Sequence, residues 1–207
     1  MLVVGMLLAR GVLAHNQHYR WLVWNLFLAW VPYIAALALT FTPRRPAWVT
    51  GGLWGVWLLF LPNAPYLVTD LIHLTWVETF NIYYDIAMVG FLAYLGLMLG
   101  FAAMQVVHGM VARARGALWG WIFAVGVWWL SALGIYLGRV PRWNSWNVLR
   151  APLAISRDAL WLLTQREPQL FIVIFGLILN LGYFIYWQSG RAHSDHSTLA
   201  PGRTKVN

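Results

Sequence analysis

Asp70 and His73 stand three residues apart in a stretch that is otherwise largely apolar. This spacing places both side chains on one face of a helix, where a carboxylate and an imidazole can share a ligand or exchange a proton. Ionisable groups are costly in lipid, so the pair indicates a functional site. Three interpretations stay open: a structural hydrogen bond that locks the segment, a binding or acid–base pair, and a metal site. The metal site needs a third ligand from elsewhere in the chain.

The pair belongs to the motif LPNAPYLVTDLIH, residues 61–73. Neither Pro62 nor Pro65 can donate a backbone hydrogen bond, so the motif predicts a broken helix. Asn63 is a favoured helix cap and predicts a second short α-helix that ends at about residue 74. One face of that helix carries all its polar side chains, which are Asn63, Tyr66, Thr69, Asp70 and His73. Irregular backbone at membrane depth is tolerated where it is buried or lines a cavity, which favours a pocket at the break.

A second polar cluster comprises Arg139, Arg142, Trp143, Asn144 and Asn147. Guanidinium groups match carboxylate and phosphate oxygens, and tryptophan faces suit a cation, a sugar or the membrane interface. A belt of interfacial side chains is the alternative interpretation. The acids Asp70, Glu78 and Asp85 have no basic residue in their own loop. We therefore predict that Asp70 or Asp85 pairs with one of the two arginines of this cluster.

The elements that position these residues are predicted to be membrane helices. Of 207 residues, 61% are hydrophobic and 10% are charged, whereas a soluble domain carries roughly 25% charged residues. The fold class is therefore all-α, a polytopic transmembrane helical bundle with one proline-broken span in a single domain over residues 1–188. Residues 189–207 are expected to be a disordered tail. A span needs about 20 apolar residues, and the segments expected in the bundle are 2–14 (short), 20–41, 47–74 (broken at 62–65), 85–108, 117–137 and 169–188.

The formal net charge is +8, and the basic residues are scattered through loops and span ends. This pattern favours contact with the lipid bilayer over nucleic acid. The short loops 42–47 and 109–116 are basic, which places them and the C-terminal tail in the cytoplasm, with 62–85 and 139–150 outside. Glycines four apart, such as Gly96 and Gly100, favour tight packing inside one bundle, with a homo-oligomer as the alternative.

The motif at 61–73, together with Tyr84-Asp85, GIYLGR at 134–139 and RWNSW at 142–146, resembles domain of unknown function family 1361. The resemblance implies a small integral protein of a bacterial inner membrane, with no activity that can be transferred.

The leading functional hypothesis is an extracytoplasmic pocket that binds or acts on a small anionic or phosphate-bearing molecule, such as a lipid head group. Arg139 and Arg142 would bind the anion, and Asp70 and His73 would exchange protons or hold the reacting group. The other residues expected to bind or orient the ligand are Asn63, Tyr66, Glu78, Asp85, Trp143, Asn144 and Asn147. The alternatives are a small permease that uses the broken helix and a non-enzymatic accessory subunit. No cofactor is identified.

Overall fold

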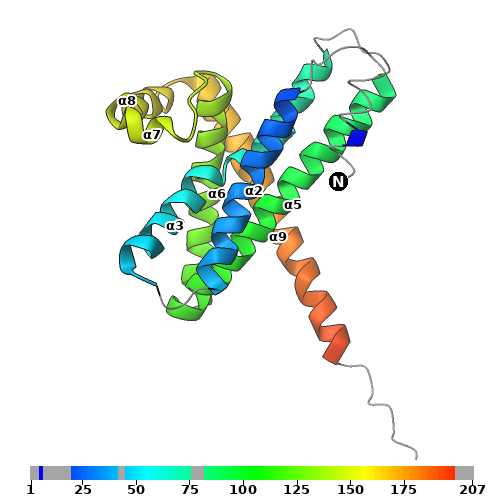
Figure 1. Ribbon diagram of the computed structural model, residues 1–207, viewed down its shortest axis with the longest axis vertical. Helices are drawn as coiled ribbons and strands as arrows, with labels where there is room; N and C mark the ends of the chain where they lie inside the picture. The colour runs from blue at the N-terminus through cyan, green and yellow to red at the C-terminus, as the bar shows by residue number, and fades with distance from the viewer. Residues whose placement is uncertain (1–4, 7–19, 42–44, 76–81, 199–207) are drawn as a thin grey trace, which may run out of the picture.

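The computed structural model describes residues 5–6, 20–41, 45–75 and 82–198 (Figure 1). The predicted N-terminal segment 2–14 thus lies almost wholly outside the described residues. Within the described ranges every regular element is helical, which confirms the all-α fold class. The elements are α2 (Arg20–Phe41), α3 (Ala47–Phe60), α4 (Asn63–Tyr66), the 3-10 helix η1 (Leu67–Thr75), α5 (Ile82–Arg115), α6 (Ala117–Arg139), α7 (Asn147–Arg150), α8 (Pro152–Leu162) and α9 (Arg166–Thr198).

Five of the described helical segments are long and apolar enough to cross a membrane. A crossing of about 30 Å needs about 20 residues at 1.5 Å per residue, and each segment meets that length. The chain is therefore a multi-pass integral membrane protein, as its composition predicts. The segments are Trp21–Phe41, Ala47–Leu74, Ile82–Arg115, Ala117–Arg139 and Arg166–Arg191.

The helices pack in two groups that share α5. Helix α2 packs against α3 and α5, while α6 packs against α5 and α9. Figure 1 shows the end of α2, the start of α3 and the turn between α5 and α6 at one end of the bundle, and α7 and α8 at the other end. The broken span and the α6–α7 turn are consequently at the same end, as the prediction requires.

The break in the second span follows from its prolines. Helix α3 ends at Phe60, and the chain then makes a single α-helical turn in which the Tyr66 amide donates to the Pro62 carbonyl at 3.0 Å. The predicted α-helix to about residue 74 is not formed, because η1 continues the chain as a 3-10 helix from Leu67 to Thr75. Residues three apart eclipse one another in a 3-10 helix, so Asp70 and His73 lie one above the other.

Glycines on the neighbouring helices bring the break into the bundle. A Cβ atom at Gly96 of α5 would collide with the Ala64 carbonyl oxygen, and one at Gly134 of α6 would lie 2.9 Å from the Pro62 ring. Missing side chains at these positions let the backbones approach closely, which is how helices associate in lipid. The proline segment is therefore held between α5 and α6 by close packing within one chain.

The last helix is longer than predicted. It runs to Thr198, beyond the predicted end of the span at residue 188. The rest of the predicted tail, residues 199–207, lies outside the described part of the chain. The Arg191 guanidinium lies 4.3 Å from the centre of the Trp187 ring, one turn earlier. Such a contact four residues apart stabilises a continued helix.

Candidate functional site

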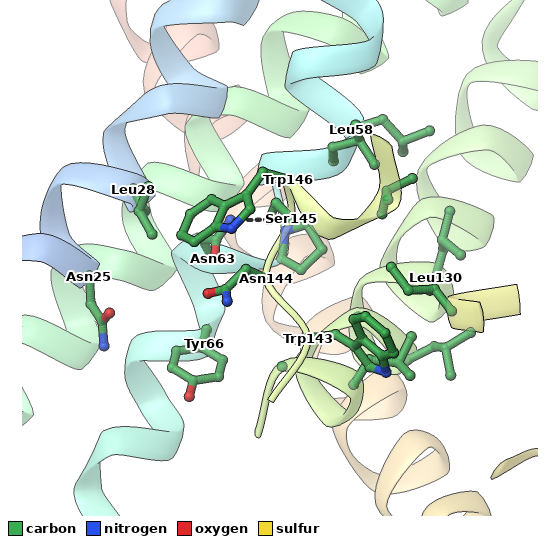
Figure 2. Close-up of a pocket in the computed structure, with 18 of the residues that line it drawn as sticks. Asn25, Leu28, Leu58, Asn63, Tyr66, Leu130, Trp143, Asn144, Ser145 and Trp146 are labelled. Atoms are coloured by element: carbon green, nitrogen blue, oxygen red, sulfur yellow. Dashed lines mark hydrogen bonds between the residues drawn. The ribbon is translucent and has the colours of Figure 1, made fainter. Parts of the chain in front are cut away.

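A pocket of about 280 Å³ lies beside the break, between α2, α3, α4, α6 and the turn at residues 143–146. Its apolar wall comes mainly from the leucines of α3 and α6. Figure 2 shows that amide and hydroxyl groups gather at the other side of the pocket, with the Asn144 side chain between those of Asn63 and Tyr66. The polar side chains that line it are Asn25, Asn63, Tyr66, Asn144 and Ser145. Tryptophans 24, 143 and 146 also line it, together with Val148 of α7 and Ile155 of α8.

The turn at 143–146 is fixed by hydrogen bonds at both ends. The Asn63 amide donates to the Ser145 hydroxyl at 2.9 Å, which joins the broken span to a turn 82 residues away. The Trp143 indole N–H donates to the Asp158 carboxylate of α8 at 3.0 Å. Within the turn, the backbone N–H of Asn144 donates to the Asn147 side-chain oxygen at 2.8 Å. The turn is thus a rigid cover for the pocket, since each end is tied to a different helix.

A second group of polar side chains adjoins the pocket at Tyr66. Asp70 is 1% exposed and accepts from Arg139 at 3.3 Å and from the Asn25 amide at 3.2 Å. The other Arg139 nitrogen lies 3.1 Å from Nε2 of His73. The Asp70–Arg139 ion pair is one of the pairings predicted from the charge distribution.

The geometry of this group assigns the roles of donor and acceptor. A guanidinium has no acceptor, so Nε2 of His73 accepts from Arg139 and carries no proton in this arrangement. Both Asp70 oxygens are engaged, one by Arg139 and the other by Asn25. A buried charge paired and hydrogen-bonded in this way joins η1, α6 and α2. Of the three interpretations of the Asp70–His73 pair, this geometry favours the first, a structural hydrogen bond that locks the segment.

Arg139 also holds a side chain of the pocket. Its guanidinium donates to the Tyr66 hydroxyl at 3.4 Å and lies 5.8 Å from the centre of the Tyr66 ring. Tyr66 lines the pocket, whereas Arg139 does not. The ion pair therefore acts on the pocket by positioning a phenol.

The structure divides the predicted site residues into separate groups. Asn63, Tyr66, Trp143 and Asn144 line the pocket, and Asp70, His73 and Arg139 form the adjoining group. Among the described residues no group of three or more His, Asp or Glu side chains could hold a metal ion.

Three predicted site residues take other places, and a fourth, Glu78, is not described. Asp85 is fully buried in α5 and does not line the pocket, and Glu78 lies outside the described residues. Asn147 stabilises the turn. Arg142 is exposed and has a φ of 62°, a left-handed conformation that bends the chain after α6 and directs it into the turn.

Sequence reasoning missed Asn25, Ser145 and Trp146 as pocket residues. Asn25 carried a usable signal, because it is an amide inside an apolar span of 22 residues, and polar groups at that depth are commonly functional. Ser145 and Trp146 belong to the motif RWNSW at residues 142–146, but no feature of the local sequence distinguishes them from their neighbours. Their place at the pocket depends on the direction in which the turn leaves α6.

Comparison with known proteins identifies the family and adds no activity. Neither the curated proteins nor the solved structures contain a significant match to this chain. A family described as "Protein of unknown function (DUF1361)" matches residues 24–181. That range holds the broken span, the α6–α7 turn and the first part of α9, up to residue 181. The chain therefore belongs to this family of proteins of unknown function.

Proposed function

We propose that the protein binds a membrane amphiphile by its polar part, in the pocket beside the broken span. The observation that carries the proposal is the division of the pocket lining. Leucines of two spanning helices form one wall, and uncharged hydrogen-bonding groups face them beside the C-terminal end of α6. A ligand with a hydrocarbon chain and a hydroxyl, amide or glycosyl head group matches both walls. Small-molecule sites are commonly built in this way, from apolar side chains and a few polar groups that orient the ligand.

The charge distribution supports an uncharged head over an anionic one. No Arg, Lys, Asp or Glu side chain lines the pocket in the described part of the chain. The charge of Arg139 is compensated by Asp70, and Arg142 is exposed outside the lining. An anion in the pocket would lie without a matched cation, and an uncompensated charge away from water is costly. We therefore assign Asp70, His73 and Arg139 the role of positioning Tyr66.

The exposed rim of the pocket supports entry of a lipid from the side. Trp24 and Leu130, which belong to its rim, are 53% and 49% exposed on the outside of the bundle, where the solvent is hydrocarbon. Arg113 and Arg115 support a cytoplasmic α5–α6 turn by the positive-inside rule. The pocket then opens in the outer half of a bacterial inner membrane, and the C-terminal end of α9 is cytoplasmic.

Lipid retention by the purified protein tests the proposal. The full chain is incubated in detergent with a monoglycosyl diacylglycerol or with phosphatidylglycerol of the same acyl chains, and bound lipid is counted by native mass spectrometry. Asn144→Ala and Tyr66→Phe each remove a polar group of the pocket. A lost hydrogen bond of about 1 kcal/mol predicts about fivefold less bound glycolipid for each. Asn180→Ala, which changes an amide of α9 outside the pocket, is the matched control and keeps wild-type retention.

The two lipids separate the uncharged head from the anionic one. Preferential retention of the glycolipid, lost in both pocket variants, supports the proposal. Preference for phosphatidylglycerol with sensitivity to the same variants would return the ligand to the phosphate class expected from the two arginines. Equal retention of both lipids by wild type and all variants would refute a ligand pocket altogether.

A further inference from the structure

We propose that the groove between α3 and α6 holds one acyl chain of the bound lipid. This inference rests on the proposed function, because the groove continues the pocket that takes the head. A second cavity of about 280 Å³ lies between these helices. Leu58 and Leu130 line both the pocket and the groove. The two spaces therefore adjoin at these leucines, and one molecule can occupy both.

The groove exists because α3 and α6 do not pack along their lengths. Helix α3 packs on α2, and α6 packs on α5 and α9, so the two helices stand in different groups. Phe123 of α6 bridges the space near its deep end, stacked on Trp57 at 5.8 Å and edge-on to Trp54 at 6.1 Å. The remaining lining residues are Gly55, Gly126 and Val127. Along α6 the lining runs from Phe123 to Leu130, a rise of about 10 Å at 1.5 Å per residue, which sets the length of the groove.

Two glycines of the groove lining face open space. A Cβ atom built at Gly55 or at Gly126 would meet no atom of the described chain within 4 Å. These glycines differ from Gly96 and Gly134, whose missing side chains admit a neighbouring backbone or proline ring. Glycine weakens the interior of a helix relative to alanine. Because no protein atom fills the space beside Gly55 and Gly126, we assign the space to a chain of the ligand.

An unmet hydrogen bond in the groove wall also points to a ligand. Trp57 is fully buried and lines the groove, and its indole N–H has no partner among the described residues. Buried donors are nearly always satisfied. An ester or amide oxygen at the head of an acyl chain is an acceptor of the required kind.

The groove is expected to contribute little to the binding free energy, because lipid is the solvent on its open side. Moving a chain from the bilayer into the groove gains no hydrophobic free energy, because hydrocarbon surrounds it in both places. Shape complementarity and dispersion remain, and these are small for each atom. The head pocket is therefore expected to supply most of the affinity, while the groove fixes the position of the chain. Filling the groove should weaken binding by about fivefold and displace the chain.

Photocrosslinking locates the chain directly. The probe is the monoglycosyl diacylglycerol with a diazirine near the end of one acyl chain, added to the full-length protein in nanodiscs. Labelled peptides are identified by mass spectrometry. We expect label concentrated on α3 around Trp54 and on α6 around Phe123. In Gly126→Leu, the label at these positions falls about fivefold. Gly90→Leu is the matched control, since a Cβ at Gly90 of α5 also meets nothing within 4 Å, and its labelling is unchanged.

The outcomes separate this inference from the function it rests on. Loss of glycolipid retention in Asn144→Ala, with label spread evenly over exposed positions such as Leu170 and Ile174 of α9, would leave the head pocket standing and overturn the chain groove. Even labelling together with unchanged retention in Asn144→Ala would overturn both, leaving annular lipid only. Label confined to the groove and lost in Gly126→Leu supports the inference.

Discussion

The Asp70–Arg139 ion pair predicts how much each single substitution lowers the free energy of unfolding. The size of each loss follows from the solvent exposure of the charged side chain that remains. Arg139→Met leaves the Asp70 carboxylate, 1% exposed, with the hydrogen bond from the Asn25 amide. Removing one member of a buried pair costs about 3–5 kcal/mol, because an uncompensated charge stays inside. Asp70→Asn leaves a guanidinium whose side chain is 20% exposed and still contacts His73. That charge can reach water, so we expect a loss of about 1–3 kcal/mol.

The double variant Asp70→Asn/Arg139→Met tests whether the two charges are coupled. With both charges removed, neither desolvation penalty remains, and we expect a loss of about 1–3 kcal/mol, below that of Arg139→Met alone. The free energy of unfolding is measured by SDS titration of the full chain in mixed micelles. Arg142→Met, a change of an exposed arginine in the same turn, is the control and should stay within about 0.5 kcal/mol of wild type. Agreement of the double variant with the sum of the singles within about 0.5 kcal/mol would refute the coupling.

Two further predictions concern packing and the pocket cover. Gly96→Ala forces a methyl group against the Ala64 carbonyl and should lower the free energy of unfolding by about 1–3 kcal/mol. Gly90→Ala, where the added methyl group meets open space, should raise the free energy of unfolding by up to about 1 kcal/mol. Equal effects of the two variants in SDS titration would contradict the close approach of Gly96 to Ala64. Trp143→Phe keeps a ring but removes the N–H that binds Asp158. It should increase amide hydrogen exchange at 143–148 and leave α9 protected, and unchanged exchange would show that the bond does not hold the turn.

Features that depend on local chemistry were predictable from the sequence. The membrane class and the five spans follow from the apolar runs, since each run must cover the same hydrocarbon thickness. The break follows from Pro62 and Pro65, which remove backbone donors whatever surrounds them. The 3-10 continuation was not predictable, because it depends on how closely α5 approaches at Gly96.

The candidate site was predictable as a set of residues and not as an arrangement. The sequence placed Asn63, Tyr66, Asn144 and Trp143 among the binding residues, and these line one pocket. It also assigned Arg139 to the ligand and left open which acid pairs with which arginine, and the structure pairs Arg139 with Asp70. A charge tally shows that a counter-charge is needed, but the distance between two charges is set by helix packing.

The sequence by itself determined that this chain is a multi-pass helical membrane protein whose second span breaks beside a polar motif, because hydropathy and missing backbone donors act within a few residues. Only the tertiary structure decided that the pocket is uncharged, that Asn25 joins it from another helix and that a groove lined by Gly55 and Gly126 continues it. Those features depend on which helix faces meet. Across lipid, where apolar surface gives no net attraction, that choice is made by the glycine contacts and hydrogen bonds between distant segments.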